Sequence, residues 1–100
     1  MKIGVDITSI SRFKQLTPGF EKRFCHIDEL KRLETQVDKA HYLASLWAIK
    51  EALFKADNSL CFFDQINIQK NNGLWVYKDW KISTSNEQDL IVAFVATDKE

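Results

Sequence analysis

The sequence has few of the residues that break or cross-link a chain: 1 Pro, 3 Gly and 2 Cys among 100 residues. Aromatic residues make up 12% and hydrophobic residues 45% of the chain. This is not the composition of a disordered or low-complexity chain. Cys25 and Cys61 are far apart and form no CxxC pair, so neither a disulfide framework nor a zinc site is indicated. We therefore expect free thiols and a cytoplasmic location.

The sequence also lacks a long apolar run and an excess of either charge. No segment approaches the roughly 20 apolar residues that span a bilayer, and the opening MKIGVDITSI lacks the flanks of a signal peptide. Lys plus Arg and Asp plus Glu both total 14, which argues against nucleic acid or a membrane as a partner. We predict one globular domain over residues 1–100.

The first third of the chain predicts a strand followed by two short helices. Residues 2–7 are rich in β-branched residues, and Ile3, Val5 and Ile7 indicate a strand with at least one buried face. A short helix is expected over residues 9–16 with Ser9 as its N-cap, because Thr17-Pro18-Gly19 would stop it. A second short helix is expected near residues 28–34.

The middle of the chain predicts one long helix from Lys39 to Asp57, with Asp38 as its N-cap. No breaking residue interrupts this segment, and the polar residues at 57–59 would end it. Its apolar side chains give a wide face for packing: Leu43, Leu46, Trp47, Ile49, Leu53 and Phe54.

The last third predicts a sheet. Residues 62–69 alternate toward Ile66 and Ile68, Asn71-Asn72-Gly73 is typical of a hairpin turn, and residues 74–83 continue as a strand. Residues 83–89 are a polar break. The segment LIVAFVAT, at 90–97, is apolar on both faces, which indicates a central strand or one covered by another subunit. The predicted class is α+β, with one long helix packed on a mainly antiparallel sheet.

Charged residues stand within the predicted long helix. Ala44, Ala48, Glu51 and Lys55 share one line of the helix, so Glu51 and Lys55 project one turn apart on the same face. This is either an exposed ion pair or part of a reaction centre. Asp6, at the end of the first strand, is either a turn cap or a second carboxylate facing Glu51. Two such carboxylates could hold Mg²⁺ against a pyrophosphate.

Two motifs resemble a known family. GVD, at residues 4–6, and WAIKEALFKA, at residues 47–56, are similar to the hallmark of the holo-acyl-carrier-protein synthases, which are small 4'-phosphopantetheinyl transferases. The segments DITSISRF, FEKRF and VAFVA resemble further parts of that family. The resemblance therefore covers most of the chain, and it is the order and separation of the two motifs that make it specific.

The resemblance implies a fold and a reaction. The family transfers the phosphopantetheine arm of coenzyme A to a serine of an acyl carrier protein in fatty acid biosynthesis and releases 3',5'-ADP. Asp6 and Glu51 would bind Mg²⁺, with Glu51 or a metal-bound water as proton acceptor, and Lys55 would offset phosphate charge. Lys50 lies off the Glu51/Lys55 line, so it either contacts substrate phosphate or extends along the apolar face.

The resemblance also implies partners. Between residues 10 and 25 the basic residues Arg12, Lys14, Lys22 and Arg23 stand beside one acidic residue. They form either an ordinary solvated face or, as in the family, the docking site of an acidic acyl carrier protein. The family is a homotrimer with coenzyme A in clefts between subunits.

The sequence departs from the family pattern at three places. Leu46 stands where members usually have Arg, and residues 57–61 replace a glycine-rich turn. Ser85-Asn86 replaces a Ser-His pair, and we expect these two residues to contact coenzyme A. Because these changes affect coenzyme A affinity rather than the metal pair, a non-catalytic module that binds a carrier protein or a nucleotide is the alternative function.

Overall fold

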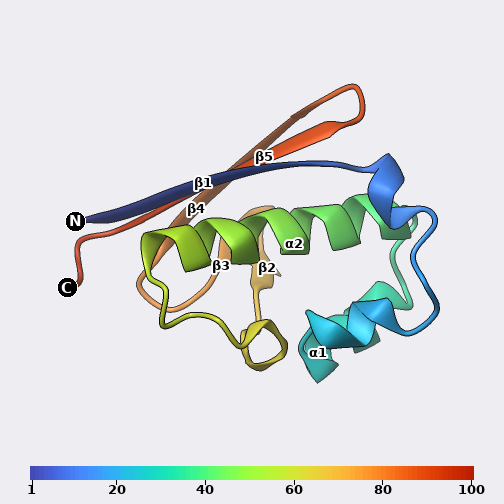
Figure 1. Ribbon diagram of the computed structural model, residues 1–100, viewed down its shortest axis with the longest axis horizontal. Helices are drawn as coiled ribbons and strands as arrows, with labels where there is room; N and C mark the ends of the chain where they lie inside the picture. Colours follow the sequence, from blue (N-terminus) through green and yellow to red (C-terminus); the bar gives the residue numbers. More distant parts are fainter.

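The computed structural model describes residues 1–100 as a long helix lying along one face of a three-stranded antiparallel sheet (Figure 1). The helix is α2 (Lys39–Ala56), and the sheet has the strand order β1-β5-β4, with bounds Lys2–Ser9, Leu90–Thr97 and Lys81–Glu87. The predicted α+β class, with one long helix on an antiparallel sheet, is confirmed.

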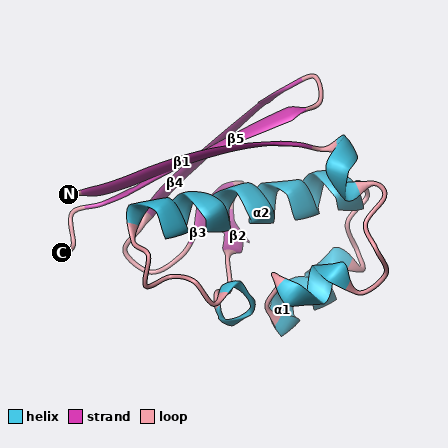
Figure 2. Ribbon diagram, in the orientation of Figure 1, coloured by secondary structure: helices cyan, strands magenta, loops and turns pink.

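The remaining elements are short, and apart from the 3₁₀ helix that follows β1 directly, they lie on the side of α2 away from β1 (Figure 2). They are the helix α1 (Ile27–Leu33), the 3₁₀ helices η1 (Ser11–Phe13), η2 (Phe20–Arg23) and η3 (Phe63–Gln65), and the two-stranded sheet of β2 (Gln69–Asn71) and β3 (Leu74–Val76). No helix has the length and apolar character required to cross a membrane.

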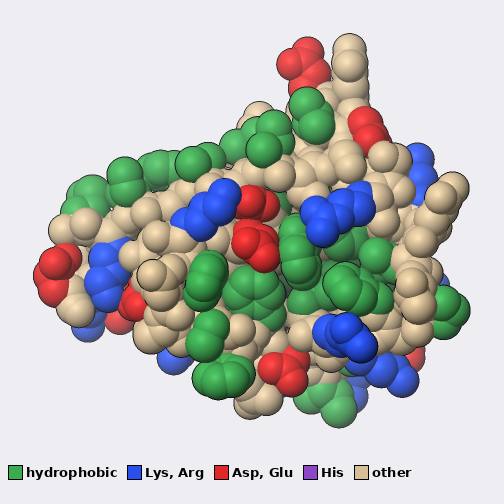
Figure 3. Space-filling view, viewed as in Figure 1, with side chains coloured by type: hydrophobic (Ala, Val, Ile, Leu, Met, Phe, Trp, Pro, Cys, Tyr) green, Lys and Arg blue, Asp and Glu red, His purple; other side chains and the backbone are tan.

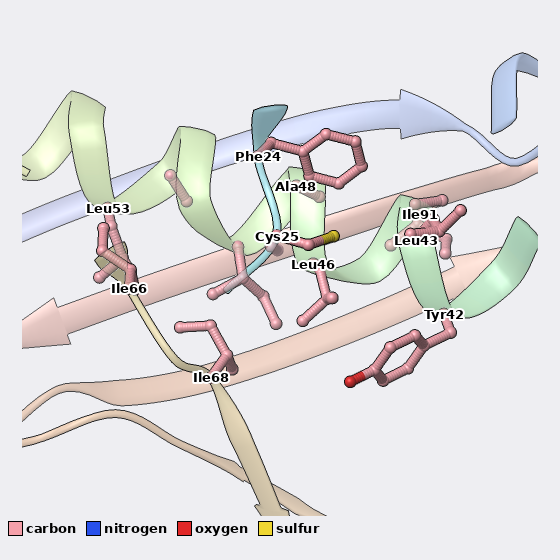
Figure 4. Packing of buried hydrophobic residues seen from close by; sticks show 14 of the residues in the cluster. Phe24, Cys25, Tyr42, Leu43, Leu46, Ala48, Leu53, Ile66, Ile68 and Ile91 are labelled. Carbon is pink, nitrogen blue, oxygen red and sulfur yellow. The ribbon is translucent and has the colours of Figure 1, made fainter. Parts of the chain in front are cut away.

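The helix α2 is stabilised by burial on both of its sides. Leu46, Ile49 and Leu53 are fully buried. They pack between Ile91, Ala93 and Val95 of β5 and the segment that carries Ile66 and Ile68, and the close-up shows several of these side chains converging (Figure 4). Burying one such aliphatic side chain contributes roughly 1.5–3 kcal/mol, so this sandwich fixes α2 between the two sides of the molecule.

Three predictions that depend on local signals are confirmed. Asp38 caps α2 by accepting a hydrogen bond from the His41 backbone N–H at 3.0 Å. The hairpin turn falls at Asn72 and Gly73, which have φ of 51° and 81° as a tight two-residue turn requires. The segment 90–97 forms β5, the central strand, paired on both edges.

The prediction that the first strand has at least one buried face is confirmed, but the buried face is not the one that carries Ile3, Val5 and Ile7. These side chains are 57%, 53% and 58% exposed, and Gly4, Asp6 and Thr8 face α2 instead. On β5, Leu90 and Phe94 are likewise about half exposed on the outer face. The sheet thus has an uncovered apolar face, and hydrophobic side chains follow the course of β1 at the molecular edge (Figure 3).

Other element bounds are corrected. The helix predicted at 9–16 is only η1, because Ser9 still pairs with Leu90 and Ser11 is tied to Asp89 through its N–H and hydroxyl. Residues 62–69 form η3 and irregular chain rather than a strand, although Ile66 and Ile68 are buried as predicted.

Two further corrections concern β3 and β4. The strand predicted at 74–83 is interrupted by a turn in which Lys78 has a φ of 49°, and only residues 74–76 and 81–83 are strand. The polar segment 83–89 is not a break, because β4 continues to Glu87. An edge strand with one face toward solvent tolerates polar side chains, which explains the misleading composition.

Candidate active site

The site forms where β1 crosses α2, and a glycine allows that crossing. A Cβ added to Gly4 would lie 2.0 Å from the Ala52 carbonyl oxygen and 2.9 Å from its carbonyl carbon. The two backbones are therefore in direct contact. Because side chains alternate along a strand, Asp6, two residues after Gly4, projects from the same face of β1. Its side chain therefore also points toward α2.

Asp6 meets the charged line of α2 at this crossing. The Lys55 ammonium donates a hydrogen bond to Asp6 Oδ1 at 3.0 Å, and Lys55 is one helical turn beyond Glu51. Partial burial and then the Asp6 carboxylate raise the pKa of Glu51, whereas Lys55 and Arg12 act in the opposite direction. A carboxylate from the first strand is thus gathered at one place with a carboxylate and an ammonium from the long helix.

Arg12 borders this carboxylate pair. Its guanidinium lies 5.2 Å from the centre of the Trp47 ring, and Nη1 donates to the Thr8 hydroxyl at 3.4 Å. Trp47 is one turn before Glu51 on α2, so Arg12 is held beside Glu51 by a cation–π contact. In the space-filling view acidic side chains lie between basic ones, above a hydrophobic area (Figure 3).

The remaining basic residues predicted to bind a partner are not part of the carboxylate cluster. Lys14 follows η1, and Lys22 and Arg23 end η2. All three side chains are exposed. They are therefore accessible from solvent, and η2 connects directly to the aromatic side chains that surround Trp47.

Ser85 and Asn86 are not brought to Asp6 within the chain. They lie on β4, which is separated from β1 by the whole width of β5. Ser85 is opposite Val92 in the register, so it shares the outer face of the sheet with Ile7. A contact between these residues and a ligand at Asp6 would require Ser85 and Asn86 of a neighbouring copy.

Lys50 is adjacent to Glu51 in sequence but points into the protein. Its side chain is fully buried, and Nζ donates to Phe24 O, Glu29 Oε1 and Phe63 O at 2.7, 2.5 and 2.8 Å. Burial lowers the pKa of Lys50 and the Glu29 carboxylate opposes this effect. Because an ammonium has three donors, none is left in this arrangement for a substrate phosphate.

Besides Ser85-Asn86, the sequence departs from the family pattern at Leu46 and at residues 57–61, and both places have a structural role in this chain. Leu46 is fully buried, so its position belongs to the core of this chain. After α2, Asp57 accepts a hydrogen bond from Lys2 Nζ at 2.8 Å and one from the Ser59 hydroxyl at 2.7 Å, which hold the pKa of Asp57 at about 2. The segment that replaces the glycine-rich turn is therefore a polar turn tied to β1.

The donor set at the crossing fits a magnesium ion that is shared with a substrate. No group of three or more His, Cys, Asp or Glu side chains lies close enough together to hold a metal alone. Mg²⁺ commonly binds through one or two carboxylates and completes its octahedron with water and substrate phosphate. Asp6 and Glu51 match that description, and Lys55 supplies a further positive charge for a phosphate.

Sequence reasoning missed two residues that shape this site. Glu29 is a fully buried carboxylate that pairs with Lys50, and no local pattern links two residues 21 positions apart. Thr8 positions Arg12 through its hydroxyl. The alternation of β1 contained the signal for Thr8, because Gly4, Asp6 and Thr8 occupy one face.

Comparison with known proteins identifies the class to which this fold and site belong. The profile of the 4'-phosphopantetheinyl transferase superfamily matches residues 2–95. The chain therefore belongs to this superfamily.

Its relatives narrow the class to one kind of enzyme. The chain is 47% identical over 93 residues to a holo-acyl-carrier-protein synthase of Mycoplasma mobile, covering 93% of this chain and 85% of the relative. It is 40% identical to the synthase of Mycoplasmopsis pulmonis, covering 93% and 86%. The crystal structure of the synthase from Neisseria meningitidis superposes with a TM-score of 0.82 at 26% identity, covering 98% of each chain. The chain is an enzyme, a phosphopantetheinyl transferase of the holo-acyl-carrier-protein synthase kind.

Proposed function

We propose that the protein transfers the 4'-phosphopantetheine arm of coenzyme A to a serine of an apo acyl carrier protein in a magnesium-dependent reaction that releases 3',5'-ADP. The observation that carries this proposal is the convergence of Asp6, Glu51 and Lys55 where β1 crosses α2. Relatives with this name act on acyl carrier protein. A Bacillus anthracis structure of the same fold contains coenzyme A as 3',5'-ADP, at a TM-score of 0.80 and 21% identity.

Each residue of the cluster has a separate role in this reaction. Asp6 and Glu51 would hold Mg²⁺, which supplies charge neutralisation for the pyrophosphate of coenzyme A. The Lys55 ammonium, which forms an ion pair with Asp6, would also bind a phosphate oxygen. Its side chain is exposed enough to reach one. Glu51 accepts the proton of the serine hydroxyl.

The bond changes balance without a further reactant. The serine oxygen forms a bond to the β-phosphorus, and the bond between that phosphorus and the bridging oxygen of the pyrophosphate breaks. The electron pair of the broken bond stays on 3',5'-ADP, and the serine proton goes to Glu51. The chain contributes by holding these groups in line and by stabilising the charge that develops on the phosphate oxygens.

The direct test uses purified protein, coenzyme A, Mg²⁺ and apo acyl carrier protein. We expect the carrier to gain the mass of one phosphopantetheine arm, read by intact mass spectrometry, and 3',5'-ADP to appear in equal amount by chromatography. Chelation of the metal should stop both changes. A carrier that keeps its mass while coenzyme A is bound would show that the chain is a non-catalytic binding module.

Arg12 is proposed to dock the acidic carrier protein at the edge of the cluster, together with Lys14, Lys22 and Arg23. Replacing Arg12 by Glu should slow association with the carrier by about tenfold at low salt, with a smaller effect at high salt, because charge complementarity acts mainly on the encounter rate. Stopped-flow fluorescence measures this rate. Lys31→Glu, an exposed charge reversal on α1, is the matched control, and equal rates for both variants at low salt would exclude the docking face.

The uncovered apolar face of the sheet is proposed to pack against two further copies of the chain in a homotrimer. Ile3, Val5, Ile7, Leu90 and Phe94 are all about half exposed on this face. Such an assembly would also allow Ser85 and Asn86 of one copy to reach the coenzyme A that is bound at Asp6 of the next. Coenzyme A is therefore proposed to lie in a cleft between subunits.

A single charge on this face tests the assembly. Phe94→Asp should convert the trimer to a monomer in multi-angle light scattering and lower transfer activity at least about tenfold, because a charge buried in an apolar interface is strongly unfavourable. Val37→Asp is the matched control, since Val37 is fully exposed outside the sheet. A Phe94→Asp variant of unchanged size would contradict the trimer.

A further inference from the structure

Lys50 and Glu29 form a closed polar node that joins α2 to four other segments. Both side chains are fully buried. Lys50 binds the Phe24 carbonyl after η2 and the Phe63 carbonyl at η3. Glu29 accepts from the His26 N–H at 2.8 Å and from the Ile68 N–H at 2.6 Å. The catalytic helix is thereby linked to η2, α1, η3 and the chain that leads into β2.

A buried ion pair of this kind is poor evidence for added stability. Apolar residues of similar volume often stabilise a fold equally well, because desolvating two charges offsets much of their attraction. A buried charged node differs from an apolar core because each donor must lie within hydrogen-bond distance of its acceptor. Only one arrangement of the joined segments satisfies this requirement. The node therefore specifies where the joined segments lie relative to α2.

The segment held most directly is the one that carries the basic residues. Phe24 follows Arg23 without a gap, and its carbonyl is bound to Lys50. The Phe24 ring packs edge-on against Trp47 with centroids 5.2 Å apart, and Trp47 in turn contacts Arg12. The backbone at Phe24 is thus fixed to the residue that immediately precedes Glu51, and the exposed side chains of Lys22 and Arg23 extend from that fixed point.

We propose that Lys50 is a positioning residue which, through Glu29 and Phe24, sets the distance between the basic end of η2 and the Asp6/Glu51 pair. In this role it determines recognition of the carrier protein and makes no contact with coenzyme A. The inference rests on the proposed function, because it concerns how the carrier is presented to that same centre. It also separates the two lysines of the motif: Lys55 acts on phosphate, whereas Lys50 acts on the protein partner.

The test uses a neutral node. In Glu29→Gln/Lys50→Met both charges are removed together, so no unpaired charge remains buried, and the amide introduced at position 29 keeps an acceptor for one backbone N–H. We expect the KM for apo carrier to rise about tenfold, whereas kcat at saturating carrier changes less than about threefold. The dissociation constant for coenzyme A, measured by calorimetry, should stay within about twofold. Ile82→Ala, in β4, is the control for general destabilisation.

A coupling measurement separates positioning from a merely structural role. Arg23→Ala should weaken carrier binding clearly in the native background and much less in the neutral-node background, because Arg23 is then no longer held in place. Equal effects of Arg23→Ala in both backgrounds would overturn the proposal, as would a loss of coenzyme A affinity in the neutral-node variant. The same holds if Ile82→Ala, at an equal loss of Tm, reproduces the rise in KM.

Failure of the proposed function gives a different result. A native protein that binds carrier but does not modify it would refute the transferase reaction. The positioning role would then be decided by the same coupling in carrier binding, measured by titration without turnover. A native protein that does not bind carrier at all would refute the positioning role directly.

Discussion

Glu51→Gln is expected to lower the transfer rate by about a thousandfold while the protein remains folded. The change would remove the proposed anionic metal ligand and the proposed proton acceptor at once, and general-base catalysis alone contributes about 10²–10⁴ to a rate. Intact mass spectrometry of the carrier over time measures the effect. Glu34→Gln, an exposed amide substitution after α1, is the control and should transfer at the native rate. Native activity in Glu51→Gln would remove the mechanism.

Although Glu51→Gln should lose activity, it should be more stable than the native protein when no metal is present. Burial and the neighbouring Asp6 raise the pKa of Glu51, so the folded protein binds this proton more tightly than the unfolded chain does. The ionised group is therefore unfavourable above the raised pKa, and the penalty disappears below the ordinary pKa of Glu. In chelator at neutral pH, Glu51→Gln should therefore raise Tm, and this gain should vanish in acid.

The pH dependence of the native enzyme follows from the same shift. A metal competes with a proton for Glu51, so apparent Mg²⁺ affinity should fall as pH decreases through the raised pKa, at a higher pH than for an ordinary Glu. Titration of Mg²⁺-dependent activity at several pH values checks this. An Mg²⁺ affinity independent of pH down to the ordinary pKa of Glu would contradict the assignment of Glu51 as a ligand.

Gly4→Ala is expected to destabilise the protein by about 3 kcal/mol or more, which lowers Tm by more than about 10 °C. The added Cβ would lie 2.0 Å from the Ala52 carbonyl oxygen and 3.1 Å from Ala56 Cβ. Because the obstacle is backbone within a helix, β1 must move away from α2. Differential scanning calorimetry measures the loss, and the folded fraction should also bind Mg²⁺ more weakly since Asp6 moves with β1.

Gly19→Ala is the matched glycine for this experiment. It has nothing within 4 Å of an added Cβ, so its only cost is a φ of 87°, about 1 kcal/mol. The difference between the two variants isolates the steric contact. A Gly4→Ala protein as stable as Gly19→Ala would mean that the backbones of β1 and α2 do not touch.

Parts of the fold with strong local signals could be predicted from the sequence. The cap at Asp38, the helix after it and the Asn72-Gly73 turn all depend on residues within a few positions of one another. The face of β1 could not be predicted in this way, because alternation shows that a strand has two faces but not which one is covered by the rest of the chain. The polar part of the edge strand β4 beyond Ser83 was missed for a related reason, since its pairing with β5 is not encoded locally.

The site shows the same division. The motifs that carry Asp6, Glu51 and Lys55 predicted residues that the fold brings together. Lys50 belongs to the same motif, but its environment is set by Glu29 and by two carbonyl groups from distant segments. Motif membership alone could not distinguish a side chain directed to solvent from one directed inward, because that depends on which segments pack around α2.

The contact between Gly4 and Ala52 makes the spacing of the reactive carboxylates depend on main-chain atoms rather than on the sizes of core side chains. A substitution of a core side chain should therefore change the distance between Asp6 and Glu51 less than a substitution of Gly4 does. A redesigned interior should therefore keep Gly4 unchanged, because any side chain at this position would separate β1 from α2.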